Sequence, residues 1–560
     1  LAGALLHRLG AWLRPGALGE TMKLRILAPV AAVLVIVMLS VVTAACGGSS
    51  DDNATSSTGS STSGTIIIAR QTDLTTLDPD RAFCDTCQIY LSAAYQTLVT
   101  LKQGSLTDAA PELASKWDVA SDLKTYTFHL DPKAKFADGK PVTADDVKFS
   151  LLRLKNIKGG GAFFMDGVSS IDTPDQATVT FSLANADSAF LFKVMAPYTA
   201  IVEASVVKAN GGSDADDADK SDQAQAYLDA HSAGSGPYML DSWTRNTELR
   251  FKKNPNYWGP LSPSADVVVI KEVKDAASQR QLLERGDIDV AMNISQDVAG
   301  QMQGTKGVQA AFAHSYNFLY MEANPSADPR LTQDVRQAMA YAIDYDGLIK
   351  ATVGGHGQQP DTTIPQGFLG TNLASPIKTD VTKAKQLLAQ GGQPNGFSIT
   401  LAYPNQVLYG VDENILAQKV ASDLGKVGIK VTLSPLEIGV WGQQYSTGKL
   451  PLTLGYWAPD YPDSSEYVSW FGLIGAEGTP SQWLGNVVDQ RIVTANTKAS
   501  TAADPAARGA AFKDIIGYMQ DDAYDVPLVQ PDLVLANRSN ISNNVYSPCC
   551  NLIIGNLTKK

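Results

Sequence analysis

Three acids stand among aromatic residues in the stretch GYWAPDYPDSSEYVSWF, residues 455–471. Asp460, Asp463 and Glu466 follow one another at steps of three, and six residues of the stretch are Tyr, Trp or Phe. Two carboxyl groups that flank a bond can hydrolyse it as acid and base, and aromatic ring faces attract cations. The stretch could therefore be a hydrolytic acid pair, a cation or metal site, a sugar platform, or a solvated loop beside a core.

Other kinds of chemistry have less support in the residues. The five histidines, at positions 7, 129, 231, 314 and 356, are too far apart to suggest a metal site by spacing. No Gly-x-Ser-x-Gly motif occurs, so the sequence names no catalytic triad. Lys and Arg total 45 against 57 for Asp and Glu, and this net charge of -12 repels phosphate backbones. We expect no metal, no cofactor and no nucleic-acid partner.

The first part of the chain resembles a bacterial lipoprotein signal peptide. Met22 begins a short basic segment, and the uncharged residues 26–45 end in small residues before Cys46. The Ser-, Gly- and Thr-rich residues that follow are too polar to pack and indicate a flexible tether. We expect 1–45 to be an upstream extension with the signal peptide, and 46–64 to be a lipidated Cys46 with its tether. The apolar segment is also long enough for a transmembrane anchor, which is the alternative.

The other four cysteines form two short-range pairs. Cys84 and Cys87 make a CxxC motif, and Cys549 and Cys550 are adjacent. In an exported protein such cysteines are more suited to disulfides than to redox chemistry or zinc. A CxxC with a distant CC is not a spacing that zinc sites commonly use. We expect disulfides and leave their connectivity open.

Helices and strands must position these residues, and the chain carries signals for both. Alternating apolar residues predict strands near 126–130, 399–401 and 429–433. Thr143 and Asp146 predict the start of a helix through a capping box, and Gly286 is typical of a helix end. Further signals are an apolar stripe within 335–343, which predicts a helix with a buried face, and an acidic segment, 211–222, which predicts a solvated insertion. A chain of 560 residues with this mixture is a large α/β protein with two or three lobes.

Several segments, in order, look like the extracytoplasmic solute-binding proteins of family 5, the peptide and nickel class that serves ABC importers. The most specific is the run from PELASKWD to FSLLRL, residues 111–154, because a Trp, a strand, Phe-Ala-Asp-Gly and a capped helix follow in family order. The resemblance covers nearly all of residues 65–540. Its other segments are TLDPDRAF, GSGPYMLDSW, KKNPNYWG, RQLLERGDIDVA and VRQAMAYAIDYDGLIK. Asp131, where the family usually has Arg or Lys, and the four cysteines depart from the pattern.

The resemblance implies an α/β, two-lobed periplasmic-binding-protein-like fold of type II (cluster C), with an extra subdomain in the first lobe. Ligand would be enclosed between lobes that close about a hinge. The family order implies lobe I from 65–102, 238–323 and 524–560, the extra subdomain from 103–237, and lobe II from 324–523. If both ends of the chain belong to lobe I, Cys84 and Cys87 could pair with Cys549 and Cys550 across more than 400 residues. Two local bridges are the alternative.

The resemblance also implies a binding site. In peptide-binding relatives a Gly-Trp-x-x-Asp segment lines the cleft, and its Asp receives the ligand's α-ammonium group. Trp457 and Asp460 have that spacing here, and Trp441 matches another cleft position. We expect the acids that follow, Asp463 and Glu466, to lie behind the site or to be exposed. The expected ligand-binding residues are Asp460, Trp457, Trp441, Tyr456, Tyr461 and Phe83.

The function implied is a receptor without catalysis. It would capture peptides or small molecules outside the cytoplasm, as a monomer held to the cell membrane by lipid, and deliver them to permease subunits. One alternative is an exported, glycosidase-like hydrolase that uses the acid cluster of residues 460–466. Another is a lipoprotein that senses a solute. Relatives with this fold bind peptides, nickel chelates, opines, polyamines or oligosaccharides, so the fold does not name the ligand.

Overall fold

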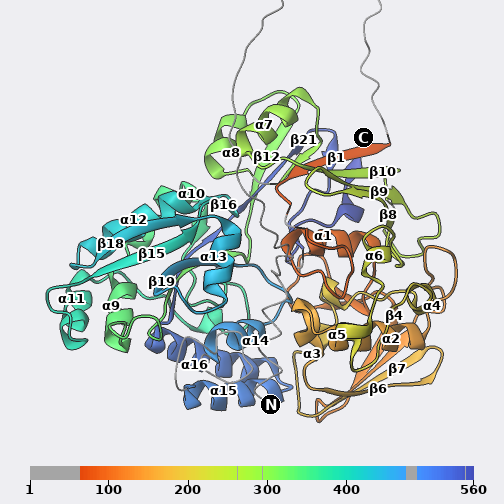
Figure 1. Ribbon diagram of the computed structural model, residues 1–560, viewed down its shortest axis with the longest axis horizontal. Helices are drawn as coiled ribbons and strands as arrows, with labels where there is room; N and C mark the ends of the chain where they lie inside the picture. Colours follow the sequence, from red (N-terminus) through yellow and green to blue (C-terminus); the bar gives the residue numbers. More distant parts are fainter. Residues whose placement is uncertain (1–63, 73, 262, 293, 474–487, 549) are drawn as a thin grey trace, which may run out of the picture. The chain divides into compact units, whose positions relative to one another are not determined.

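The computed structural model describes residues 64–72, 74–261, 263–292, 294–473, 488–548 and 550–560. This part of the chain is a mixed α/β structure, as the sequence predicts (Figure 1). Its strands form three main sheets, of seven, six and four strands, together with three small two-stranded sheets. None of the described helices combines the length and the apolar composition that a membrane crossing requires.

The seven-stranded sheet contains both parallel and antiparallel pairs. β1 pairs in parallel with β10 and β11, and β10, β9 and β8 continue as antiparallel neighbours (Figure 1). The order is β12 (Val308–Ala313), β21 (Leu533–Arg538), β11 (Val290–Ala291), β1 (Thr65–Arg70), β10 (Val267–Glu272), β9 (Glu248–Lys253) and β8 (Tyr238–Thr244). α7 (Ala276–Arg285) and α8 (Gln296–Met302) belong to the same region of the chain, and Gly286 ends α7 at φ 84°, a conformation that Gly adopts without strain.

The six-stranded sheet is built around two strands that are buried along their full length. These are β13 (Phe318–Ala323) and β20 (Asp525–Pro531), which pair with each other. The order is β14 (Gly357–Gln358), β20, β13, β19 (Leu452–Trp457), β15 (Ser398–Pro404) and β18 (Lys430–Leu436). Because β13 and β20 are hydrogen-bonded in this sheet, the predicted boundaries at 323/324 and 523/524, which place both strands in lobe I, are wrong at these strands. Buried neighbours on both faces explain their nearly continuous apolar sequence.

Helices surround the six-stranded sheet, and their apolar stripes face the core. α9 lies beside α11, and α15 lies beside α16 (Figure 1). The stripe predicted within 335–343 is confirmed, since Val335, Ala338 and Met339 are fully buried. The helices are α9 (Gln333–Ala342), α10 (Tyr345–Val353), α11 (Val381–Gln390), α12 (Glu413–Gly425), α13 (Ile438–Tyr445), α14 (Ser464–Tyr467), α15 (Gln490–Thr501) and α16 (Pro505–Asp522).

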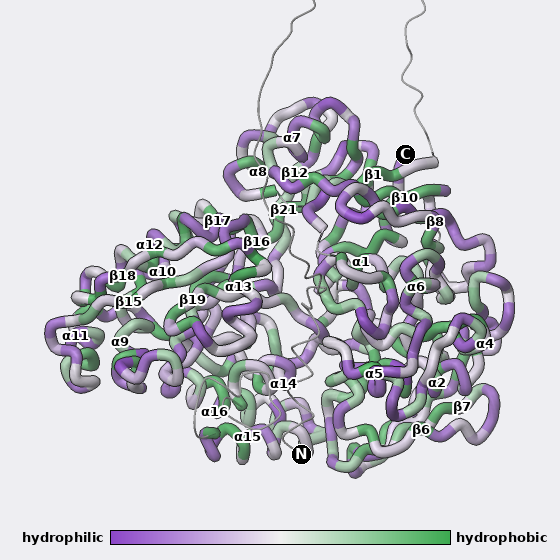
Figure 2. The backbone as a smooth tube through the Cα atoms, in the orientation of Figure 1, coloured by the Kyte–Doolittle hydropathy of each residue, from purple (hydrophilic) through white to green (hydrophobic). Residues whose placement is uncertain are grey.

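The four-stranded sheet and its helix come from the segment predicted as an extra subdomain. α2 (Ala144–Ile157) begins with the predicted capping box, in which Thr143 and Asp146 bond each other's backbone amides. The sheet order is β4 (Ala114–Val119), β5 (Thr125–Leu130), β7 (Thr178–Leu183) and β6 (Val168–Asp175). α5 (Ala218–Ser221) is hydrophilic, in line with a solvated insertion (Figure 2). Asp222 behind it, however, is buried against the guanidinium of Arg153 at 2.8 Å.

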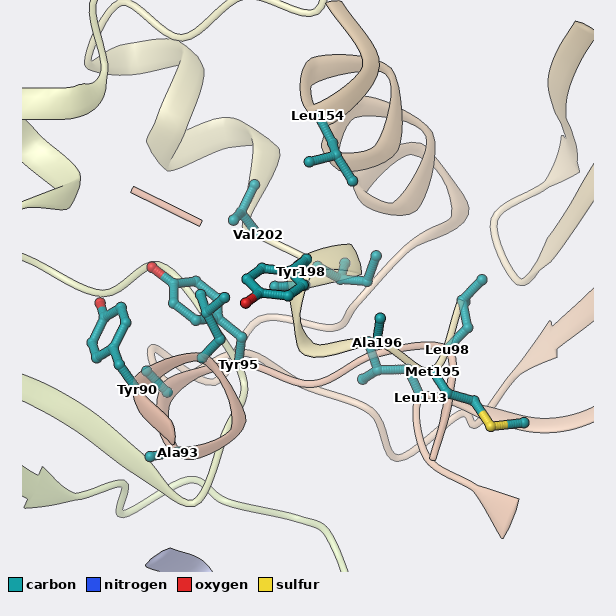
Figure 3. Close-up of a cluster of buried hydrophobic side chains, with 14 of the residues drawn as sticks. Tyr90, Ala93, Tyr95, Leu98, Leu113, Leu154, Met195, Ala196, Tyr198 and Val202 are labelled. Atoms are coloured by element: carbon teal, nitrogen blue, oxygen red, sulfur yellow. The ribbon is translucent and has the colours of Figure 1, made fainter. Parts of the chain in front are cut away.

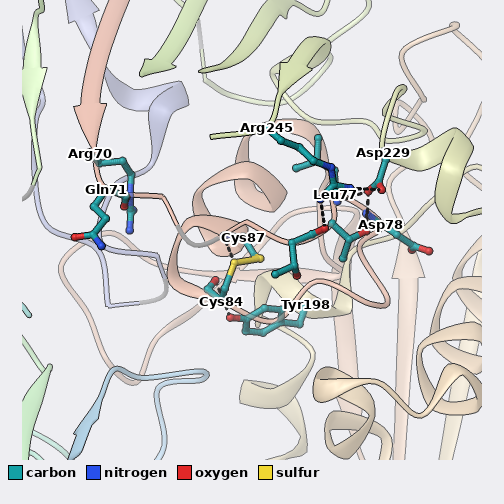
Figure 4. The surroundings of a disulfide bond; sticks show 11 residues. Arg70, Gln71, Leu77, Asp78, Cys84, Cys87, Tyr198, Asp229 and Arg245 are labelled. Atoms are coloured by element: carbon teal, nitrogen blue, oxygen red, sulfur yellow. Dashed lines mark hydrogen bonds and ion pairs between the residues drawn. A yellow bond between two sulfur atoms is a disulfide. The ribbon is translucent and has the colours of Figure 1, made fainter. Parts of the chain in front are cut away.

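A disulfide joins Cys84 and Cys87 at the start of α1 (Asp85–Ala94), beside Tyr198, whose hydroxyl donates to the Cys84 carbonyl at 3.2 Å (Figure 4). The structure therefore contains the local bridge, and the predicted alternative that pairs these two cysteines with the C-terminal pair is wrong. Cys550 is also disulfide-bonded, whereas Cys549 lies outside the described residues. α1 packs into the core shown in Figure 3, where Tyr90 projects from the helix and Tyr95 follows its end.

Candidate functional site

The acid stretch begins in the last residues of β19 and passes through a loop, 458–463, into α14. The loop is held by Glu466, which is fully buried. Its carboxylate accepts a hydrogen bond from Trp457 Nε1 at 2.7 Å and from the backbone amides of Asp460 and Tyr461 at 3.1 Å. Burial nevertheless raises the pKa of Glu466 to about 8, because these donors only partly replace water. Glu466 therefore acts as the internal support of the loop.

Asp463 holds the other end of the loop through a buried ion pair. Arg508 from α16 donates to both of its carboxylate oxygens, at 2.5 and 2.7 Å. Asp463 also caps α14 by accepting from the amide of Ser465 at 2.9 Å. Burial alone would raise the pKa of Asp463, but the Arg508 charge lowers it. Of the two predicted positions for Asp463 and Glu466, behind the site or exposed, the exposed one is wrong, because both residues are buried and bonded to other groups.

Asp460 differs from both, because its side chain is buried without a full set of partners. It is 6 % exposed, and its Oδ2 accepts no hydrogen bond within the described residues. Burial, and then the nearby carboxyl of Glu466, raise the pKa of Asp460 well above its ordinary value. An unpaired buried carboxyl is costly, so such a group usually stays protonated or meets a cation.

A cavity of about 230 Å³ borders Asp460 and Pro462. Its walls come mainly from residues within 91–104, which lead from the end of α1 through β2 (Val99–Leu101) into the turn before β3 (Ala109–Pro111), and from residues within 195–200, 257–261 and 545–556. Its volume is of the order of the smaller ligand pockets, which begin at about 300 Å³. Asp460 thus lies at the edge of a space large enough for part of an organic ligand.

Three of the predicted aromatic residues lie in apolar contacts beside this loop. Trp457 packs against Trp470, with ring centroids 4.4 Å apart. Tyr461 is 2 % exposed and belongs to the core that contains α1 and α2, where its ring lies 5.9 Å from Phe164. Phe83 stands next to the disulfide, with its ring 4.7 Å from that of Tyr198.

Trp441 and Tyr456 form a separate group in the six-stranded part of the protein. Their rings stack at 5.8 Å, and Trp441 also stacks on Tyr445 at 5.0 Å. Trp441 Nε1 donates to Thr453 Oγ1 at 2.9 Å, and this hydrogen bond fixes the indole of α13 against β19. Of the six predicted ligand-binding residues, Asp460 alone borders the cavity, and the other five lie beside it or in this second group.

Sequence reasoning missed the residues, from the core that contains α1, that lie near the loop of Asp460. Gln88 of α1 donates from Nε2 to the Pro459 carbonyl at 3.4 Å. Tyr95 and Tyr546 line the same cavity as Asp460. They come from segments far apart in sequence, and the only signal that could have brought them together was the family order that places both chain ends in one lobe. Among the described residues no group of three His, Cys, Asp or Glu side chains could hold a metal ion.

Comparison with known proteins identifies the family. Residues 108–477 match the model of bacterial extracellular solute-binding proteins, family 5 Middle. The chain belongs to this family. A probable D,D-dipeptide-binding periplasmic protein, DdpA of Escherichia coli K12, is 31% identical over 494 residues, which cover 86% of this chain and 92% of the relative. A dipeptide-binding protein of Escherichia coli K12 is 29% identical over 394 residues, 67% of this chain and 72% of the relative.

Solved structures of other solute-binding proteins share the fold of this family 5 protein. The periplasmic binding protein AgaA of A. tumefaciens R10, in complex with agropinic acid, matches with a TM-score of 0.75 at 26% identity, covering 89% of this chain and 99% of that one. A dipeptide-binding protein of Pseudoalteromonas sp. SM9913 with Met-Leu matches with a TM-score of 0.78 at 20% identity, covering 89% and 100%. The predicted two-lobed type II fold is confirmed. The family consists of extracellular solute-binding receptors, and nothing supports the hydrolase alternative.

Proposed function

We propose that this protein captures peptides with a free amino terminus in the cleft at Asp460 and delivers them to the permease of an ABC importer. The observation that carries the proposal is the buried carboxyl of Asp460, a residue that lines a cavity and whose Oδ2 accepts no hydrogen bond within the described residues. Relatives named as dipeptide-binding and D,D-dipeptide-binding proteins support the ligand class. The role is binding without catalysis.

The physical basis is charge compensation in a buried site. An ammonium group supplies both the positive charge and the donors that Asp460 lacks, so ligand binding would favour its ionised form. Trp457, Tyr461 and Phe83 exclude water around this contact, and Trp441 with Tyr456 shapes the adjacent space on the second lobe. Because Asp460 comes from one lobe and most cavity walls from the other, a ligand that contacts both would favour the closed form that a permease can distinguish.

The test compares the charge on each side of the proposed contact. Asp460→Asn should weaken binding of a free peptide by about two to three orders of magnitude, since removing one partner of a buried charge pair costs about 3–5 kcal/mol. N-acetylation of the same peptide should cause a similar loss, with little further loss when both changes are combined. Calorimetry measures all four combinations. Asp346→Asn, at an exposed aspartate of α10, is the matched control and should bind as the unaltered protein does.

One result would refute the ammonium contact. If free and acetylated peptides bind equally well, Asp460 has another role, and an uncharged ligand such as an oligosaccharide is favoured. A lipoprotein that senses the ligand, instead of delivering it to a permease, would give the same results in these binding experiments. Neighbouring genes for two permease and two ATPase subunits would support transport over sensing.

The proposed location of the protein, at the cell membrane, depends on a segment that lies outside the described residues. The signal-peptide resemblance around Cys46 supports anchoring to the extracytoplasmic face of the cell membrane by lipid on that cysteine. We propose that the protein acts there as a monomer. The polar residues after Cys46 would then act as the tether between the lipid and the folded part.

A further inference from the structure

Ser188 bonds to the C-terminal end of α15 from a distant part of the chain. It lies between β7, in the four-stranded sheet, and α3 (Phe190–Lys193), whereas α15 shares an apolar core with β13 of the six-stranded sheet. The amide of Ser188 donates to the Ser500 carbonyl and its hydroxyl donates to the Ala499 carbonyl, both at 3.0 Å. The last carbonyls of a helix have no partner in the next turn. Ser188 therefore gives donors to a helix end that would otherwise bond to water.

The turn that carries Ser188 is held in place by its own subdomain. Tyr126 of β5 donates from its hydroxyl to the Asp187 carbonyl at 2.6 Å. The Asp187 carboxylate accepts from the Ala189 amide at 2.9 Å and from the Lys193 ammonium at 2.7 Å. These bonds fix the residues on both sides of Ser188, so its donors are oriented before they meet α15. A group that is already oriented loses little conformational freedom when it makes a contact.

Aromatic contacts join the same two regions at a second place. Phe163 lies edge-on to Trp470, with ring centroids 6.0 Å apart, and Phe164 lies edge-on to Tyr461 at 5.9 Å. Neither these four residues nor Ser188 line the cavity beside Asp460. The two regions therefore contact each other at places that do not border that cavity.

We infer that the segment predicted as the extra subdomain is a latch for the closed form, in which Ser188 bonds to the end of α15 only when the lobes close. Water replaces both hydrogen bonds when the lobes open, so each contributes modestly and the latch can release. The latch and the ligand favour the same form, so their contributions to closing add. The inference goes beyond the proposed function, because it gives the predicted subdomain a role that needs no ammonium contact at Asp460.

The first experiment uses the mature protein without ligand. The double variant Ser188→Cys/Ser500→Cys can form a disulfide, because the hydrogen bond between these two backbones brings them within the range that a disulfide spans. Small-angle X-ray scattering should give a smaller radius of gyration for the oxidised variant than for the reduced one, since the crosslink holds the lobes closed. The unaltered protein with the same reductant is the control, because it contains the Cys84–Cys87 bridge. Equal radii for the two forms of the variant would overturn the inference.

The second experiment measures binding of the dipeptide Met-Leu to Ser188→Ala by stopped-flow fluorescence. This substitution removes one of the two donors and should weaken binding about two- to tenfold, the range that one net hydrogen bond gives. The loss should be a faster dissociation with an unchanged association rate, because the latch forms after the ligand has entered the open cleft. Ser170→Ala is the matched control, since Ser170 of β6 donates to Asp172 of the same strand at 2.9 Å, and it should leave both rates unchanged.

The outcomes separate the latch from the proposed function. Equal dissociation rates for Ser188→Ala and the unaltered protein would overturn the latch and leave the proposed ligand class intact. An equal loss in Ser170→Ala would assign the effect to a general weakening of the subdomain and would also overturn the latch. If Met-Leu does not bind the unaltered protein, the proposed peptide binding is contradicted, and the scattering comparison still decides for or against the latch.

Discussion

The three acids of the aromatic stretch have different roles because their surroundings differ. Arg508 neutralises Asp463, three N–H groups donate to Glu466, and Asp460, which lines a cavity, has an Oδ2 that accepts no hydrogen bond within the described residues. Three equally spaced acids thus include two that support the loop and one, Asp460, whose buried carboxyl lacks a full set of hydrogen-bond partners. A hydrolase would need two of these carboxyl groups facing one substrate, whereas two of the three already have partners within the protein.

Substituting the two supporting acids should destabilise the fold. Asp463→Asn should lower the free energy of unfolding by about 3–5 kcal/mol, because it leaves Arg508 buried without its counterion. Glu466→Gln should lower it by about 1–3 kcal/mol, because an amide group cannot accept from all of the donors that the carboxylate holds. Urea denaturation measures both, with Asp346→Asn and the half-exposed Glu248→Gln as controls.

The pH dependence of Asp463 gives a second readout for the same prediction. Its pKa is lowered by Arg508, so its contribution is present above the unfolded-state pKa and is lost as pH falls through the folded-state value. Asp463→Asn should therefore remove part of the acid-induced loss of stability. Losses below about 1 kcal/mol in both variants would contradict the buried arrangement, since exposed charges contribute no more than that.

Sequence alone could not assign these roles, because the deciding partners are distant. Arg508 lies 45 residues beyond Asp463 in the chain. Tyr461 becomes part of a core whose other members come mostly from the first half of the sequence. The resemblance did single out Asp460, and the structure leaves that side chain without a full set of partners. It could not foresee that the other expected ligand-binding residues do not line the same cavity.

At the scale of elements, local signals predicted local structure well. The capping box at Thr143, the helix end at Gly286 and the alternation in residues 126–130 depend on neighbours within a few positions, and all three are present in the structure. β13 and β20 were assigned to the wrong lobe, because an apolar strand does not reveal which sheet it joins. Their pairing in the six-stranded sheet joins residues 319–322 to residues 525–529, which are far apart in the sequence.

The disulfide at the start of α1 should be present in the purified protein and should contribute little to its stability. Non-reducing peptide mapping should recover a peptide with Cys84 bonded to Cys87. Because this bridge closes a very short loop, the chain-entropy model gives it only about 2 kcal/mol, against about 5 for a loop of several hundred residues. The double variant Cys84→Ser/Cys87→Ser should thus remain folded, with a modest loss in urea denaturation. A peptide linking either cysteine to Cys549 or Cys550 would contradict the structure.

At the scale of the whole described protein, a few contacts join the chain after β19 to α1 and to the segment predicted as the extra subdomain. Gln88 holds the Pro459 carbonyl, Phe163 packs edge-on against Trp470 at 6.0 Å, and Ser188 donates to the Ala499 carbonyl at 3.0 Å. These contacts join segments more than 300 residues apart. A receptor that reports ligand by closing needs such contacts between its lobes to be few and weak enough to break. A ligand bound between the lobes then supplies the further interactions that favour the closed form.

The last prediction concerns attachment of the protein to the membrane. Several acyl chains on Cys46 would hold the protein firmly, whereas a single chain binds a bilayer only marginally. In cells, the unaltered protein should partition into the detergent phase, and Cys46→Ser should lose this partitioning. Cys84→Ser, a substitution at a cysteine within the folded part, should leave partitioning unchanged. If Cys46→Ser still sediments with membranes as an uncleaved chain, the apolar residues 26–45 are a transmembrane anchor, and the lipoprotein interpretation is wrong.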